Sequence, residues 1–135
     1  MSAGNEGARG DVRQLAGVAV LVCAADGPRV AAERDAADLV GEAMSNDAQM
    51  VALPVARLGE RFLDLSTRLA GEVLQKLVTY GLRVAIVGDV SQAVARSGAL
   101  RDFVRESNRG RQVWFVANLA ELEARLAGGD APAAG

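Results

Sequence analysis

The segment STRLAGEVLQKLVTYGLRVAIVGD, residues 66–89, decides the fold because its hydrophobic period changes along its length. Over residues 66–80 the apolar side chains recur every three or four positions, a spacing that predicts an amphipathic helix. Ser66 or Thr67 is a natural N-cap for this helix, and Gly81 is a natural end. Residues 83–88, which are apolar after Arg83, predict a buried strand that leads into a Gly-Asp turn.

The alternation of helix and strand continues on both sides of this segment. Apolar runs predict strands at residues 18–23, 50–55 and 112–117, and residues 11–15 are expected to pair with the first of them through a turn at 16–17. Helical spacing predicts helices at residues 33–45, 97–110 and 119–127. We therefore expect one α/β domain over residues 11–127, with about four to five mostly parallel strands and flanking helices. The small polar residues at 1–10 and 128–135 are expected to form disordered tails.

Several single residues carry structural expectations. Pro54 has no N–H for a sheet ladder, so it should lie at the end of its strand or at a sheet edge. Trp114 and Phe115 are neighbours in the last strand, so one should face the core and the other should lie under a helix or at an interface. Gly71 costs a helix roughly 1 kcal/mol relative to alanine, and we expect close packing of the helix on the sheet to compensate for it.

The composition limits where the protein acts. Half of the 135 residues are hydrophobic, which is enough for one core, yet no apolar run approaches the roughly 20 residues of a membrane helix. The N-terminus has no signal-peptide pattern, and Cys23, the single cysteine, is expected to be a buried thiol. These features predict a cytoplasmic protein without membrane association. The net charge of −2 argues against a nucleic-acid partner.

The absence of histidine limits the chemistry. It removes the commonest general base, the serine–histidine pair and most zinc sites. No turn has the spacing of a P-loop or a dinucleotide fingerprint, so we expect no nucleotide, cofactor or metal. An enzyme would have to use carboxylates or Lys76, the only lysine, for proton transfer.

The long helix carries the first group of candidate functional residues. Glu72 and Lys76 have the favourable spacing and order for an ion pair worth about 0.2 to 0.5 kcal/mol. Together with Gln75 and Thr79 they form either a ridge that contacts a partner or ligand, or a solvated helix face.

Two further groups lie near chain turns. Asp89 follows a buried strand, where it could act as a catalytic or binding acid, or cap the turn. In the polar run at 100–111, Arg105, Arg109 and Arg111 could together hold a phosphate or carboxylate. Glu106 and Asn108 are candidates in the same run, although Asn108 is also of the type that ends helices.

Three motifs carry a family resemblance. Residues 69–76 (LAGEVLQK), 85–89 (AIVGD) and 100–110 (LRDFVRESNRG) resemble the signature of a bacterial family known as domain of unknown function 4180. The resemblance covers most of residues 18–126 and implies a small standalone α/β protein without an established activity.

The order of predicted elements also resembles the STAS fold of anti-sigma-factor antagonists and sulfate-transporter tails. That fold carries a D-S-S-G-L-G motif at the start of a helix, and residues 65–70 can be laid over it. The resemblance implies that Ser66 occupies the phosphorylation position. Leu65 stands at the position of the acid, and Arg68 stands at the position of the first glycine.

These observations favour a STAS-like regulatory or binding module that acts through a protein or small-molecule partner. Its contact face would include Ser66, Thr67, Glu72, Gln75 and Lys76. A small enzyme that uses Asp89, Glu72, Lys76 or Glu106 is an alternative, and so is a self-associating structural or stress protein. The oligomeric state stays open, with a homodimer among the options.

Overall fold

The computed structural model describes residues 10–129 of the chain, and most of the two expected tails, at 1–9 and 130–135, lies outside this range. In chain order the elements are β1 (Asp11–Leu15), β2 (Val18–Val22), α2 (Glu33–Ser45), β3 (Met50–Pro54), α3 (Glu60–Leu63), α4 (Leu69–Thr79), β4 (Arg83–Val87), α5 (Ser91–Arg96), α6 (Gly98–Arg109), β5 (Val113–Val116) and α7 (Leu119–Ala124). Short helical turns lie at Val55–Arg57, Leu65–Thr67 and Arg125–Gly129, so residues 128–129 end a turn rather than begin a tail.

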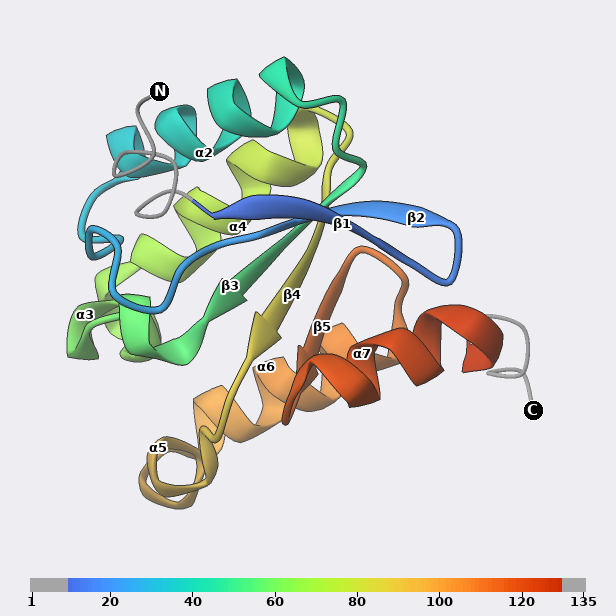
Figure 1. Ribbon diagram of the computed structural model, residues 1–135. Coiled ribbons are helices and arrows are strands. Elements are labelled where there is room, and N and C mark those ends of the chain that lie inside the picture. Colours follow the sequence, from blue (N-terminus) through green and yellow to red (C-terminus); the bar gives the residue numbers. More distant parts are fainter. Residues whose placement is uncertain (1–9, 130–135) are drawn as a thin grey trace.

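A single five-stranded sheet forms the centre of the domain (Figure 1). Its strand order is β1-β2-β3-β4-β5, with β1 antiparallel to β2 and every other neighbouring pair parallel. Ala16 and Gly17 both have positive φ angles, the geometry of the tight turns that join antiparallel strands. Pro54 is the last residue of β3, as its missing N–H predicts. The predicted mostly parallel α/β architecture is confirmed.

The two faces of the sheet are covered differently. Residues of α2, α4 and α6 pack on one face, where the larger core cluster lies. Helix α7 packs on the other face, around a smaller cluster. Figure 1 shows α2 and α4 side by side, and each of them leads into a neighbouring parallel strand.

Trp114 and Phe115 point to opposite faces of the sheet, as predicted. Trp114 is 1% exposed in the smaller cluster, and Phe115 lies in the larger one. The guanidinium carbons of Arg83 and Arg125 lie 4.7 and 4.2 Å from the centre of the Trp114 ring. The indole Nε1–H donates to the Gly110 carbonyl at 2.8 Å. These contacts tie the start of β5 to its flanking elements.

The predicted helix at 66–80 begins later than expected. It starts at Leu69, and the residue before it, Arg68, has a left-handed φ of 66° and makes no side-chain cap. The expected N-cap at Ser66 or Thr67 is therefore wrong. The Ser66 hydroxyl donates to the Asp64 carboxylate, and the Thr67 hydroxyl lies close to the carbonyls of Arg61 and Asp64, which keeps this stretch in a separate turn. The Thr67 hydroxyl also accepts the Leu69 N–H at 3.3 Å, so it contacts the start of the helix without being its N-cap. At the other end Gly81 has a φ of 82°, which confirms the predicted end.

Candidate functional site

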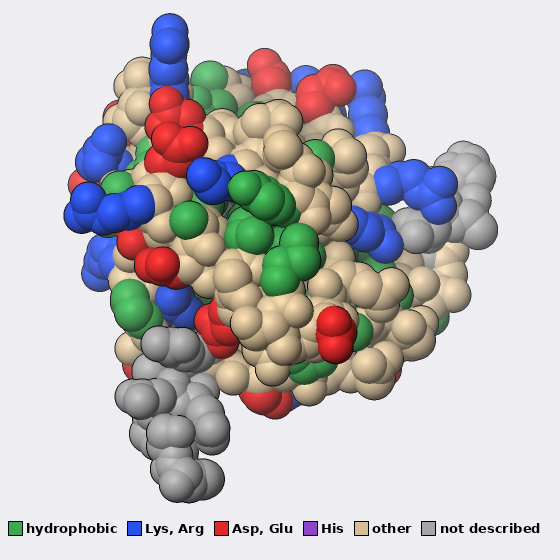
Figure 2. Space-filling view, turned by 90° about the horizontal axis from the view of Figure 1, so that it is seen from above, with side chains coloured by type: hydrophobic (Ala, Val, Ile, Leu, Met, Phe, Trp, Pro, Cys, Tyr) green, Lys and Arg blue, Asp and Glu red, His purple; other side chains and the backbone are tan. Residues whose placement is uncertain are grey.

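The outer face of α4 borders a shallow groove. The groove has a volume of about 670 Å³ and is lined by Glu33, Gly71, Glu72, Gln75, Lys76, Thr79 and Tyr80. We call it the α4 groove. The groove is lined by all four members of the ridge predicted on this helix, Glu72, Gln75, Lys76 and Thr79. Figure 2 looks down on the side of the molecule where α2 and α4 lie, and hydrophobic side chains gather there among scattered acidic and basic ones.

Glu72 and Lys76 do not form the expected ion pair. Within residues 10–129 neither side chain has an ion pair or a side-chain hydrogen bond, although their spacing favours one. Beside them, the Gln75 amide donates to the Thr79 hydroxyl at 3.2 Å. The charges of Glu72 and Lys76 are therefore available to another molecule.

Gly71 does not pack against the sheet. It is exposed, and an added Cβ would meet no atom within 4 Å, so the expected close packing is wrong. The helical period explains this, because Gly71 lies one turn before Gln75, and both are on the exposed face of α4. The fold itself thus gives no steric reason for a glycine here, and the residue leaves bare backbone in the α4 groove.

Ser66 and Thr67 lie just before α4. Ser66 is exposed, and its hydroxyl and backbone N–H both bond to the Asp64 carboxylate, at 2.7 and 3.0 Å. The hydroxyl and then the N–H hold the pKa of Asp64 below its ordinary value. Thr67 is half-buried, and its hydroxyl lies 2.6 Å from the Arg61 carbonyl. Ser66 is accessible to a partner, whereas Thr67 stabilises the local turn.

Asp89 has a local partner in the turn after β4. Its carboxylate accepts the Ser91 backbone N–H at 2.8 Å, and hydrogen bonds from Ser91 lower the pKa of Asp89. The preceding Gly88 has a φ of 138°, and a Cβ there would lie 2.9 Å from a Val55 methyl, so only glycine fits. These contacts are those of a turn cap.

The candidates on α6 are linked to their own neighbours. Arg105 pairs with Asp102 at 2.9 Å, and Glu106 pairs with Arg109 at 3.3 Å. The Asn108 side chain accepts the Phe115 N–H at 2.7 Å and also bonds to Arg125. The expected arginine cluster for a phosphate or carboxylate thus has two members engaged with carboxylates, while Asn108 fastens β5 to α6.

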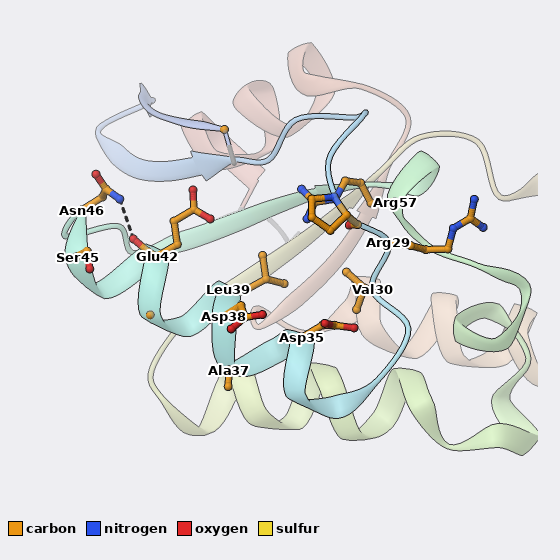
Figure 3. A pocket seen from close by; sticks show the side chains of 13 residues that line it. Arg29, Val30, Asp35, Ala37, Asp38, Leu39, Glu42, Ser45, Asn46 and Arg57 are labelled. Carbon is orange, nitrogen blue, oxygen red and sulfur yellow. Dashed lines mark hydrogen bonds between the residues drawn. The ribbon is translucent and has the colours of Figure 1, made fainter. Parts of the chain in front are cut away.

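A second hollow lies beside α2, and the sequence did not predict it. This Arg57 cavity has a volume of about 680 Å³ and is lined by Gly10, Pro28, Arg29, Val30, Asp35, Ala37, Asp38, Leu39, Gly41, Glu42, Ser45, Asn46 and Arg57. Figure 3 shows α2 on one side of it and Arg57 on the other, with Arg29 extending away. The only hint in the sequence is an arginine within the otherwise apolar run at 50–58.

Two charged side chains of the Arg57 cavity, Arg57 and Asp35, are held by backbone groups of the fold. Arg57 is 6% exposed, and its guanidinium donates to the Pro28 and Ala24 carbonyls at 2.5 and 3.2 Å. Asp35 accepts two backbone N–H groups at the start of α2. Burial raises the pKa of the nearby Cys23 thiol to about 12, against a smaller opposing effect of Arg57. The thiol is therefore neutral and unreactive near pH 7.

The candidate residues do not converge on one pocket. Ser66 and Asp89 lie near the carboxyl end of the parallel strands, Glu72, Gln75 and Lys76 run along α4, and Asn108 lies near the start of β5. Among residues 10–129 no cluster of three or more acidic, cysteine or histidine side chains could hold a metal ion. In the same part of the chain, no helix is long and apolar enough to cross a membrane.

Fold and surface together define a small α/β domain with a mostly parallel sheet, whose candidate residues are spread over its surface. The chain belongs to the family described as Domain of unknown function (DUF4180), which matches residues 15–126. No curated protein and no solved structure matches the chain.

Proposed function

We propose that this protein is a STAS-like regulatory module of the cytoplasm, and that it binds a partner protein through the outer face of α4. One observation carries the proposal: Glu72 and Lys76 line the α4 groove without any ion pair in the described part of the chain. Charged side chains that the fold does not use are free to contact another molecule. The neighbouring Tyr80, 51% exposed, adds an aromatic side chain of a type enriched in interfaces.

The geometry before α4 supports the STAS-like part of the proposal. Arg68 stands where the D-S-S-G-L-G motif has a glycine, and its φ of 66° is in the left-handed region that favours glycine. Leu65 stands at the position of the motif's acid, but Asp64 supplies a carboxylate 2.7 Å from the Ser66 hydroxyl. Ser66 is exposed, as a phosphorylation site must be. A phosphate on Ser66 would place negative charge at the end of the binding face.

A partner protein fits this surface better than a substrate does. The α4 groove is shallow, and Asp89 and Glu106 are occupied by a turn N–H and by Arg109 rather than facing the groove. The enzyme alternative requires acid and base groups that meet around one reacting atom. The candidates here are distributed along a helix face instead.

The test is the double variant Glu72→Ala/Lys76→Ala, examined by urea denaturation and by capture of partners from lysate. Its free energy of unfolding should stay within about 1 kcal/mol of the parent, because Glu72 is exposed, Lys76 is only half-buried, and neither has an ion pair in the described chain. Capture should be lost. The matched control is Asp11→Ala/Arg13→Ala, which removes an exposed ion pair from β1 and should preserve capture. Capture that survives in the α4 variant contradicts the proposal.

A further inference from the structure

We infer that the partner on the α4 groove is a second copy of this chain, related to the first by a two-fold axis that passes beside Leu74. This inference rests on the proposed function, since it names the partner of the same surface. It follows from the order of the side chains along α4 and from their lack of partners within the described chain.

Charge complementarity is the first argument. Glu72 and Lys76 lie at equal distances on either side of Leu74 in the sequence. When two α4 helices pack antiparallel about an axis at Leu74, each Glu72 lies beside the Lys76 of the other copy. The contact therefore forms two ion pairs at once, from charges that have no ion pair within residues 10–129.

The same axis pairs a second set of side chains. Arg68 and Tyr80 also lie at equal distances from Leu74. Both are exposed, and neither side chain has a hydrogen bond or ion pair in the described part of the chain. The axis brings the Arg68 guanidinium of one copy to the Tyr80 ring of the other, an arrangement that favours a cation–π contact. One axis thus provides partners for four side chains of each copy.

Gly71 explains how the helices approach one another. It lines the groove with bare backbone, and the fold places no atom within 4 Å of an added Cβ. Under the same symmetry the stem of Lys76 from the second copy crosses Gly71 to reach Glu72. A side chain larger than hydrogen at position 71 would hold the helices apart. Close approach of the two helices thus gives a reason for a glycine at position 71, whereas the fold of a single chain gives none.

The interface is small. Residues 68–80 extend over about 18 Å of helix, so the contact falls at the low end of stable interfaces. We therefore expect a reversible dimer whose population rises with protein concentration.

The test is analytical ultracentrifugation of the full chain from about 1 μM to 1 mM. The parent chain should show a reversible monomer–dimer equilibrium. Glu72→Lys and Lys76→Glu should each weaken self-association by roughly tenfold or more, because each variant opposes like charges across the axis. The control Asp102→Lys, which breaks an exposed α6 ion pair, should leave the dimer unchanged.

Mixing the two charge-reversal variants gives the decisive result. Across the same axis the Glu72→Lys chain and the Lys76→Glu chain present opposite charges at both contacts, so an equimolar mixture should form heterodimers. A monomeric parent chain over the whole range overturns the inference, and so do single variants that associate like the parent or a mixture that stays monomeric. A monomeric parent whose Glu72→Ala/Lys76→Ala variant loses capture of a different protein would leave the proposed function standing and reject only self-association.

Discussion

The Arg57 cavity and the α4 groove are nearly equal in volume, about 680 and 670 Å³, yet a pair of charged side chains in each is used differently. In the cavity, Arg57 and Asp35 bond to backbone groups of neighbouring segments and hold the chain in place. In the groove, Glu72 and Lys76 make no such contacts in the described chain. The volume of a hollow therefore says less about function than whether the fold already uses its polar groups.

Among the substitutions that test this comparison, we expect Arg57→Ala to have the largest effect on stability. The change leaves the Ala24 and Pro28 carbonyls without their charged donor and removes a packed side chain. We expect the free energy of unfolding to fall by about 2 to 4 kcal/mol, measured by urea denaturation. Arg29→Ala, at the exposed side of the same cavity, is the control and should change it by less than about 0.5 kcal/mol. If the two substitutions changed the free energy of unfolding equally, the claim that the fold uses the charge of Arg57 would be contradicted.

Gly71→Ala should act in the opposite direction and more weakly. Alanine fits in the open space beside Gly71 and lowers the entropy of the unfolded chain, so stability should rise by about 0.5 to 1 kcal/mol. Gly41→Ala is a matched control, since Gly41 is also exposed within a helix with no atom near an added Cβ. Both variants should gain stability, but only Gly71→Ala should weaken the binding of the partner to the α4 groove. Equal binding by the two variants would mean that bare backbone in the groove has no role.

The smallest effect concerns Asp64. Its folded pKa is lowered by the Ser66 hydroxyl and N–H, so its contribution to stability is present above the unfolded pKa and is lost as the pH falls through the folded pKa. Ser66→Ala removes the hydroxyl donor and should raise the Asp64 pKa towards its ordinary value, as seen in an NMR titration of the carboxyl group. Ser91→Ala, beside Asp89, should leave the Asp64 pKa unchanged. A Ser66→Ala chain with the parent pKa at Asp64 would show that the hydroxyl does not contribute.

Much of the fold could be predicted because it depends on local periodicity. The helix at 33–45 has the predicted limits, and each predicted core strand ends within one residue of the observed one. The short helices α3 and α5 were not predicted, since four and six residues are too few to establish a helical period. The late start of α4 was missed because the side chains of Ser66 and Thr67 donate to the chain before them, and because Arg68 has a left-handed conformation that a local pattern does not show.

The candidate site was predicted only in part. Periodicity identifies the outer face of α4, but it cannot show that Glu72 and Lys76 stay apart, because rotamers decide that contact. The role of Arg57 depends on carbonyls 29 and 33 residues earlier in the chain, and a local pattern contains no information on such contacts. Asn108 likewise bonds to a strand that follows a turn.

The central claim, that the outer face of α4 binds another protein, is tested most directly by site-specific photo-cross-linking in cells. A photoreactive residue replaces Gln75 in the α4 groove, or Ala120 on the exposed side of α7 as a control. The account predicts a defined cross-linked species from position 75, with the partner identified by mass spectrometry, and none from position 120. No cross-linked species from position 75, or the same species from both positions, would contradict it.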